Sequence, residues 1–162
     1  MATSSTDQEA SFAFHNPAPL TDGDLTLVLI DRMPGNPTRN WLPSYHFAMR
    51  HADTGEHLGH IDLRIGMTPH LLRYGGNIGY EVLEKHQGHR YAARSCRLLL
   101  PLARDHGMAE LWITCDVDNI ASRRTAELAG FALVDVLPLR EEDHPDAYAE
   151  GRRFTCRYRL LL

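Results

Sequence analysis

This chain of 162 residues has no long apolar run. No window approaches the roughly 18 consecutive apolar residues that a membrane-spanning helix needs. Residues 1–9 are polar and rich in Ser and Thr, without the apolar stretch of a signal peptide. We therefore expect a cytoplasmic protein with no membrane partner.

Cysteine and positive charge are also scarce. The three cysteines, Cys96, Cys115 and Cys156, are widely spaced and lie in apolar segments. An odd, scattered set of this kind indicates reduced core residues rather than disulfides. The formal net charge is −4, so no overall basic field attracts nucleic acid, and we expect no nucleic-acid partner.

Ten histidines raise the question of a metal site, but the chain has no Cys-x-x-Cys pair. His57 and His60 are three apart in a predicted strand, which sends their side chains to opposite faces. His86 and His89 flank a turn without a third ligand of suitable spacing. We expect no metal. His86 is either a second candidate for acid–base chemistry or an ordinary surface turn residue.

The length and the pattern of elements indicate one domain of the α+β class. We expect residues 1–20 to form a loose N-terminal arm and residues 21–162 to form a single domain. Apolar–polar alternation and turn residues predict strands at 25–31, 45–51, 57–65, 77–83, 111–115, 131–136 and 154–160. Helices are predicted at 92–106 and 120–129.

Residues 78–92 are the most informative stretch, because a strand leads through a glycine turn into a helix. The first turn of a helix has unpaired N–H donors and the positive end of the helix dipole. Such a point suits a phosphate group, and the stretch therefore predicts a nucleotide-like pyrophosphate site.

Two segments together resemble a known family. The first is Gly79-Tyr80-Glu81-Val82 followed by Gln87-Gly88-His89-Arg90-Tyr91-Ala92, and the second is Asn119-x-x-Ser122 followed by Gly130-Phe131. Their order and spacing, over residues 57–160, resemble the GNAT superfamily of N-acetyltransferases, and most of all its ribosomal-protein N-terminal acetyltransferase branch. The resemblance implies a GNAT-type mixed, mostly antiparallel central sheet with flanking helices.

The resemblance also implies an activity. A GNAT enzyme moves an acetyl group from acetyl-CoA, its co-substrate, to a primary amine by direct attack in a ternary complex. The amine is a protein N-terminus or a small molecule, and the sequence does not separate acetyl from a longer acyl group. The alternative is a non-catalytic acyl-CoA-binding or regulatory module on the same fold.

The implied cofactor site combines the glycine turn with the edge of the preceding strand and the next helix start. The turn amides would hold the pyrophosphate of coenzyme A, and one amide at Val82 or Leu83 would polarise the thioester carbonyl. The cofactor-binding residues implied in this way are Val82, Leu83, Gln87, Gly88, His89, Arg90, Tyr91, Ala92, Asn119 and Ser122.

Glu81 and Ser122 are the implied catalytic residues. An acceptor amine with a pKa of about 10.4 is protonated at neutral pH and needs a base. Glu81 would take the proton through a water; otherwise it is a solvent-facing strand carboxylate. Ser122 or a water would protonate the departing thiolate, because many relatives place a tyrosine where this chain has Ala126.

Arg90 departs from the family pattern, Gln/Arg-x-x-Gly-x-Gly/Ala, because it replaces the first glycine of the phosphate loop. Its guanidinium can pair with a phosphate of coenzyme A. It obstructs the loop if that position needs a positive φ. The sequence leaves both outcomes open.

The acceptor side also departs from the family. Relatives insert two helices between the first two strands, whereas here only the breaker-rich residues 32–43 lie between them. We expect an acceptor side that is open, or that is completed by the N-terminal arm or by a second subunit in a homodimer. The residues assigned to the acceptor are Tyr80, Trp41 and Tyr45, of which the last two otherwise pack at a sheet edge.

Two further groups of polar residues have two interpretations each. The loop 137–151 is rich in Asp and Glu and either attracts a cationic amine or is simply solvated. His60, Asp62 and Arg64 alternate along one predicted strand, so they share a face that either lines the acceptor groove or is exposed.

Overall fold

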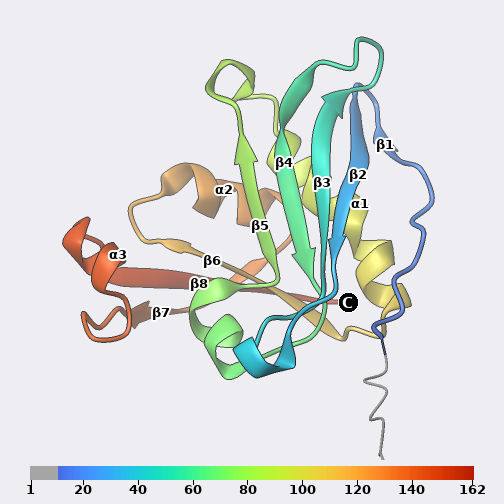
Figure 1. Ribbon diagram of the computed structural model, residues 1–162. Helices are drawn as coiled ribbons and strands as arrows, with labels where there is room; N and C mark the ends of the chain where they lie inside the picture. Colours follow the sequence, from blue (N-terminus) through green and yellow to red (C-terminus); the bar gives the residue numbers. More distant parts are fainter. Residues whose placement is uncertain (1–10) are drawn as a thin grey trace, which may run out of the picture.

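The computed structural model describes residues 11–162, which form two antiparallel sheets (Figure 1). The first sheet has the order β1-β2-β3-β4-β5 and the second has the order β6-β8-β7. The first contains β1 (Leu20–Asp22), β2 (Leu25–Met33), β3 (Ser44–His51), β4 (His57–Arg64) and β5 (Ile78–Val82). The second contains β6 (Glu110–Asp116), β7 (Ala132–Pro138) and β8 (Phe154–Leu161).

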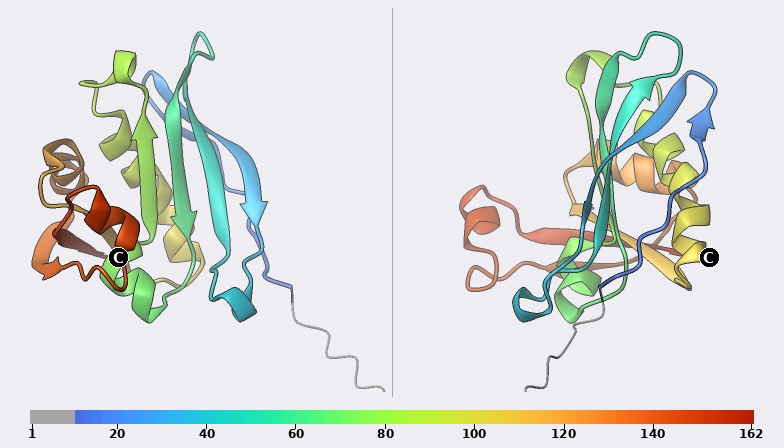
Figure 2. Two further views of the ribbon diagram at one scale, coloured as in Figure 1. Left: turned by 60° about the vertical axis from the view of Figure 1, so that its left-hand side comes forward. Right: turned by 45° about the vertical axis from the view of Figure 1, so that its right-hand side comes forward.

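The helix α1 (Tyr91–Asp105) packs on one face of the first sheet, and α2 (Ile120–Leu128) packs on α1 and on the second sheet. The remaining α-helix of the described residues is α3 (Pro145–Ala149). Short turns of helix are η1 (Pro37–Arg39), the π-helix η2 (Leu71–Gly75) and η3 (Glu84–His86). Figure 2 shows the first sheet nearly edge-on, with α1 along one side of it. Within residues 11–162, no helix is both long enough and apolar enough to cross a membrane.

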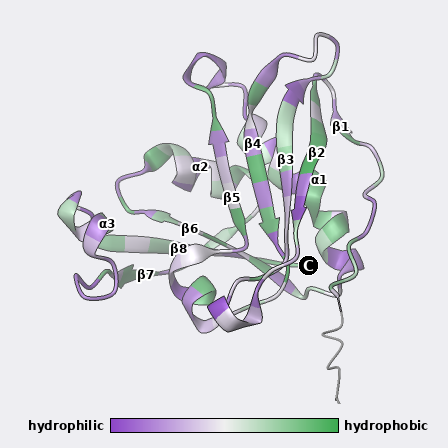
Figure 3. Cartoon of the chain, viewed as in Figure 1, coloured by the Kyte–Doolittle hydropathy of each residue, from purple (hydrophilic) through white to green (hydrophobic). Residues whose placement is uncertain are grey.

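The core lies between the first sheet and α1. Tyr45, Phe47 and Met49 alternate along β3 and are completely or almost completely buried, as are Cys96 and Leu99 of α1. Figure 3 shows both apolar and polar residues along the strands of this sheet. The apolar side packs on α1, and the polar side is left on the opposite face.

All seven predicted strands and both predicted helices are present, with ends that differ by a few residues. The fold is the α+β sheet architecture expected for the GNAT family, with every ladder antiparallel among the described residues. The sequence analysis did not predict β1, α3 or the three short helical turns η1, η2 and η3. Each is short, and α3 has only five residues, too few to show a helical period.

The described part of the N-terminal arm packs against the domain. Residues 11–19 have no regular secondary structure, but Phe12 packs on the core. The backbone N–H of His15 donates to the Tyr45 hydroxyl at 2.7 Å. Residues 1–10 of the expected arm lie outside the described residues.

The connection between β2 and β3 is as short as the sequence indicates. Residues 34–43 contain η1 and, in place of two α-helices, no other helix. The face of the sheet opposite α1 is therefore open beside this connection. The described part of the arm runs along the α1 side (Figure 2) and does not cover that face.

Candidate functional site

The two sheets separate between β5 and β6. They meet at Asn77, whose N–H donates to the Trp112 carbonyl at 2.7 Å and whose Oδ1 accepts from the Trp112 N–H at 2.9 Å. Gly76 allows this close approach, because a Cβ there would lie 2.9 Å from the Trp112 carbonyl oxygen. Beyond this junction no ladder joins β5 to β6, and the strands diverge (Figure 1). The divergence leaves one edge of β5 unpaired.

The hydrogen-bond pattern of β5 shows which amides face the gap. The Leu83 N–H donates to the Leu58 carbonyl at 2.9 Å, inside the first sheet. Successive residues of an antiparallel strand direct their N–H groups to alternate sides, so the Val82 N–H points into the gap. The Val82 carbonyl, on that same side, accepts from Gln87 Nε2 at 3.2 Å. Leu83 thus cannot supply the free amide, and Val82 is the residue that can.

Gly59 brings β4 unusually close to β5, on the paired edge of β5. A Cβ on Gly59 would lie 2.1 Å from the Glu81 carbonyl oxygen and 2.9 Å from Val82 Cα. Only glycine fits such an approach without moving β5. Gly59 thereby fixes the positions of Glu81 and Val82 relative to β4.

A cavity of about 550 Å³ occupies the gap, and we call it the gap cavity. It brings together most of the predicted residues, namely Tyr80, Glu81, Val82, Gln87, Gly88, Arg90, Tyr91, Ala92, Asn119 and Ser122. Two predicted cofactor residues, Leu83 and His89, are not in its lining. It also includes residues that the sequence analysis did not single out, namely Ala121, Arg124, Thr125 and Leu128. Steps of three or four residues along α2 were the signal that could have found three of them, because Thr125 is three after Ser122 and Leu128 is three after Thr125, while Arg124 is three after Ala121.

The N-terminus of α1 forms one wall of the gap cavity. No side chain caps this helix end, so the first-turn amides have no side-chain acceptor. Arg90 is the N-cap and has φ 60° and ψ 25°, the left-handed conformation that favours glycine. The position therefore has a positive φ, which glycine adopts freely, although it holds an arginine here.

Hydroxyl groups gather at the opposite wall. Tyr80 Oη lies 2.8 Å from Ser122 Oγ and donates to the Ser122 carbonyl at 3.1 Å. Burial raises the pKa of Tyr80 well above its usual value, so the phenol stays neutral. Burial also raises the pKa of Cys115 to about 11, which keeps this neighbour of Ser122 a thiol at neutral pH. Asn119 caps α2 by accepting from the Ser122 N–H at 3.0 Å.

A larger cavity of about 1070 Å³ lies over the open polar face, and we call it the sheet-face cavity. Its lining includes Ile30, Met33, Trp41, Ser44, His46, His60, Asp62 and Arg64. The three polar residues that alternate along β4 thus line this cavity.

Two close pairs of side chains lie at the sheet-face cavity. His46 Nδ1 lies 2.8 Å from Asp62 Oδ1. His60 lies opposite Glu81 on the neighbouring strand, with 3.9 Å between Nε2 and Oε2. Because Glu81 lines the gap cavity and is 71% exposed, the two cavities adjoin at the His60–Glu81 pair.

The structure separates the residues that were assigned to the acceptor. Trp41 lines the sheet-face cavity, with the Arg39 guanidinium 5.0 Å from its ring centre. Tyr45, in contrast, is completely buried on the α1 side, and its hydroxyl bonds to His106 Nε2 at 2.7 Å. Tyr45 therefore belongs to the core and not to an acceptor wall. Tyr80 lines the gap cavity instead.

His86 lines the gap cavity together with Glu81. Residues 137–151 form the end of β7, a turn, the helix α3 and the turn after it, and they are not in the lining of either cavity. His144 of this loop nevertheless packs on His70, which lines the sheet-face cavity, with 5.8 Å between ring centres. His86 lies 3.1 Å from Glu56, which also binds Lys85 at 2.8 Å. Across residues 11–162, no three His, Cys, Asp or Glu side chains are arranged to hold a metal ion.

A sequence profile described as the acetyltransferase (GNAT) domain matches residues 3–132, which is most of the chain. The protein therefore belongs to the GNAT acetyltransferase family. A search of curated proteins finds no match.

Solved structures with the same fold include two that contain a form of the coenzyme. The microcin C7 self-immunity acetyltransferase MccE, in complex with acetyl-CoA and AMP, is 22% identical with a TM-score of 0.57, over 74% of this chain and 61% of that one. RimL, the ribosomal L7/L12 alpha-N-protein acetyltransferase, in complex with coenzyme A, is 23% identical with a TM-score of 0.57. The alignment covers 74% of this chain and 62% of RimL.

A third structure is the acetyltransferase from Salmonella typhimurium that modifies the N-terminal serine of ribosomal protein L7/L12. It is 21% identical with a TM-score of 0.54, over 77% of this chain and 66% of that one. The aligned part spans just under two thirds of the length of each of these proteins. At such identities the likeness shows a common fold.

Proposed function

We propose that this protein transfers an acetyl group from acetyl-CoA to a primary amine by direct attack in a ternary complex. The observation that carries the proposal is the gap cavity, where the free Val82 amide, the uncapped start of α1 and the Ser122 hydroxyl meet. A GNAT domain needs these three features for its donor. The neighbours bound to acetyl-CoA and coenzyme A support the same choice of donor.

The residues of the gap cavity fit coenzyme A. Residues 87–92 and the uncapped first turn of α1 offer N–H groups and a positive dipole end to the pyrophosphate. Arg90 and Arg124 add two guanidinium groups to the lining. The side-chain NH₂ of Asn119, which is not used in the cap, faces the pantetheine end. When bound, acetyl-CoA supplies the activated acetyl group.

Three residues perform the chemistry in this proposal. Glu81 accepts the proton of the acceptor amine through a water, with His60 beside it. The Val82 N–H donates to the thioester oxygen as negative charge develops there. Ser122 donates a proton to the departing sulfur and regains a proton from solvent, while the neutral Tyr80 hydroxyl bonded to Ser122 Oγ holds the serine side chain in place. Cys115, held as a thiol, is not a nucleophile in this scheme.

The first test compares binding of the donor with binding of other nucleotides. Acetyl-CoA at a hundred times its dissociation constant should stabilise the protein by about 2.7 kcal/mol, and ATP and NAD should not. Release of the coenzyme A thiol in the presence of amines then measures turnover. A failure to bind acetyl-CoA would refute the proposal.

Glu81→Gln separates an enzyme from a non-catalytic acyl-CoA-binding module. The variant should keep its affinity for acetyl-CoA and lose on the order of a hundredfold in kcat, because general base catalysis contributes about that much. Glu84→Gln is the matched control, since Glu84 is a nearby exposed carboxylate in η3 outside both cavities. Binding without any turnover in the unaltered protein would favour the module.

A further inference from the structure

Arg64, which lines the sheet-face cavity, extends over Gly79, a residue of β5. A Cβ on Gly79 would lie 3.8 Å from both terminal nitrogens of Arg64, in van der Waals contact with the guanidinium. Asp62 is directly opposite Gly79 in the β4–β5 ladder. Glu81 follows two residues along β5 and therefore projects to the same face. The absence of a side chain at Gly79 thus leaves room for the guanidinium on a face that also carries two carboxylates.

Most N–H donors of the Arg64 guanidinium have no partner among the described residues. Within residues 11–162 the guanidinium makes one hydrogen bond, from Nη1 to the Gly76 carbonyl at 3.3 Å. Of the carboxylates in residues 11–162, none forms an ion pair with it, although Arg94 and Arg157 each pair with aspartates. Asp62 is bound by His46 instead. A planar guanidinium with free donors in a cavity is suited to a carboxylate from outside the protein.

The part of this face next to Glu81 is suited to an amine. The Glu81 carboxylate is largely exposed and lies 3.9 Å from His60, and in the register of the strands Asp62 adds a second negative charge between Glu81 and Arg64. Gly79, under the Arg64 guanidinium, and Glu81 are two residues apart, which is about 6.6 Å along a strand. The ammonium and carboxylate of an α-amino acid sit on one carbon, so with a hydrogen bond of about 2.8 Å at each end they match a spacing of this order.

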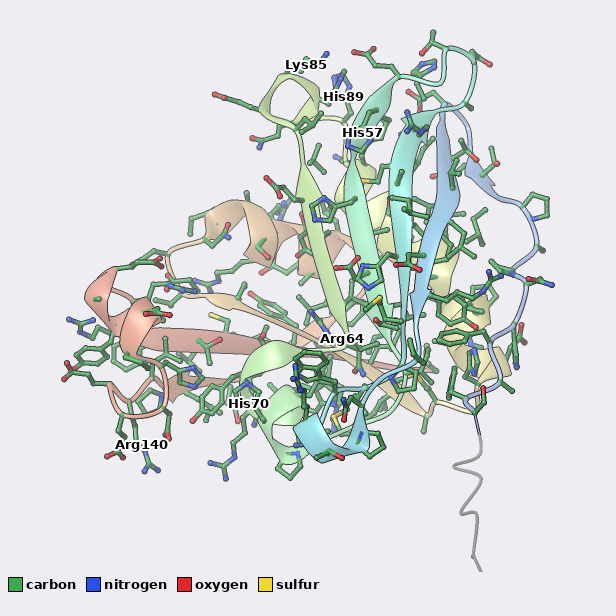
Figure 4. All side chains as sticks on the ribbon, viewed as in Figure 1. His57, Arg64, His70, Lys85, His89 and Arg140 are labelled. Atoms are coloured by element: carbon green, nitrogen blue, oxygen red, sulfur yellow. The ribbon has the colours of Figure 1, made fainter. Side chains whose placement is uncertain are left out.

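We propose that the acceptor is a free α-amino acid whose carboxylate binds Arg64 and whose amine faces Glu81. This inference rests on the proposed acetyl transfer. The carboxylate of the amino acid would lie near the lower end of β4 in Figure 4, where Arg64 is labelled beside the β2–β3 connection. The rest of the cavity extends to Ile30, Met33 and Trp41, all of them exposed. These apolar side chains are suited to an amino acid with an apolar or aromatic side chain.

The test measures acetylation of three related amines, phenylalanine, phenylalaninamide and phenethylamine, which differ at the carboxylate. The unaltered protein should favour phenylalanine over the other two by at least tenfold in kcat/KM, because a charge-assisted contact is lost in each. Arg64→Gln should raise KM for phenylalanine about tenfold and leave phenylalaninamide unchanged, so that the preference disappears. Arg64→Lys should restore part of it.

The three amines also distinguish a carboxylate-binding role of Arg64 from a purely structural role, in which it only holds the Gly76 carbonyl. A purely structural role would lower kcat/KM for all three amines together and lower the melting temperature. Arg50→Gln is the matched control, because Arg50 on the neighbouring strand β3 makes the same kind of bond, to the Gly55 carbonyl at 3.0 Å, outside both cavities. It should leave the preference intact.

Equal use of phenylalanine and phenylalaninamide by the unaltered protein would overturn the proposal. So would equal use of the dipeptide Phe-Gly, whose carboxylate is one residue further from the amine. If acetyl-CoA binds and no amine causes release of the thiol, the proposed acetyl transfer is refuted. Binding of the amines, measured by calorimetry, then tests the amino-acid site by itself. Phenylalanine should then bind the unaltered protein more tightly than phenylalaninamide and lose this advantage in Arg64→Gln; no difference would overturn the site.

Discussion

Arg90 holds a backbone conformation that costs an L-amino acid roughly 1–2 kcal/mol. It has φ 60° at the start of α1, and its side chain is exposed. The residue lines the gap cavity, and no ion pair of its side chain occurs within residues 11–162. Arginine at this position therefore lowers the stability of the loop and adds a positive charge beside the proposed phosphate site.

Arg90→Gly should separate these two effects. Glycine relieves the left-handed strain, and after its greater freedom in the unfolded state is subtracted, the free energy of unfolding should rise by up to about 1 kcal/mol. Affinity for coenzyme A should fall on the order of tenfold, because a charge-assisted contact is worth about 1.5 kcal/mol. Chemical denaturation and calorimetric titration measure the two quantities.

Asn40→Gly is the control for the backbone effect. Asn40 is the other non-glycine residue with positive φ among the described residues, at φ 57°, and asparagine tolerates this conformation better than arginine does. Its replacement should therefore give a smaller gain in stability and no change in affinity for coenzyme A. If Arg90→Gly binds coenzyme A as well as the unaltered protein, the guanidinium is not a phosphate ligand.

At the scale of elements, the N-terminal arm is held to the end of α1 by His106. The ring of His106 bonds to the Tyr45 hydroxyl at 2.7 Å and stacks on His15 with 4.0 Å between ring centres. Burial, and then the charge of His15, lowers the pKa of His106 below its ordinary value of 6.5, while Asp105 raises it by less. The packed arm therefore favours a neutral His106.

The stability of the protein should consequently fall in mild acid. A histidine with a lowered pKa in the folded state takes up a proton more readily when unfolded, so its contribution is complete above about pH 6.5 and is lost as the pH falls below it. The melting temperature should drop between pH 7.5 and pH 5.5. His106→Gln, which keeps a hydrogen bond to Tyr45 without titrating, should show a smaller drop. Equal drops in both proteins would exclude His106 as the cause.

The strands and long helices were predictable because their patterns are local. Tyr45, Phe47 and Met49 alternate with polar residues, and β3 follows from that period alone. The π-helix η2 carries no such signal, since its form depends on contacts with other elements. The Tyr74 carbonyl accepts from Thr114 at 2.8 Å, and the Leu72 carbonyl accepts from Arg157 at 3.2 Å.

The candidate site was predictable where it rests on a motif in one segment. The loop from Gln87 to Ala92 and the start of α2 were identified in this way. The choice of Val82 over Leu83 depends on the register with β4, which no single segment contains. The assignment of Tyr45 to the acceptor was wrong. Tyr45 is close in sequence to the β2–β3 connection, but its position in β3 faces α1, so its side chain is buried in the core.

For the whole molecule, the decisive feature is the junction from which the two sheets diverge. Asn77 is completely buried there. Its Nδ2 donates to the Arg64 carbonyl at 3.3 Å and to the Gly66 carbonyl at 3.0 Å, and its Oδ1 accepts from the Trp112 N–H. One side chain therefore joins both sheets and the connection before η2, and it fixes the point from which the gap cavity opens.

Asn77→Ala should lower the free energy of unfolding by about 2–4 kcal/mol, because a buried N–H and two buried carbonyls lose their partner. Acetyl-CoA should also stabilise the variant less, since the angle between the sheets is no longer fixed.

Asn77→Asp keeps the acceptor for Trp112 but turns a carboxylate oxygen toward two carbonyls, so it should be no more stable than the alanine variant. Asn16→Ala, at an exposed asparagine bonded to Arg32, is the control and should change stability by less than about 0.5 kcal/mol. Denaturant unfolding with and without acetyl-CoA measures each effect, and an Asn77→Ala protein of unchanged stability would show that the sheets are joined by other contacts.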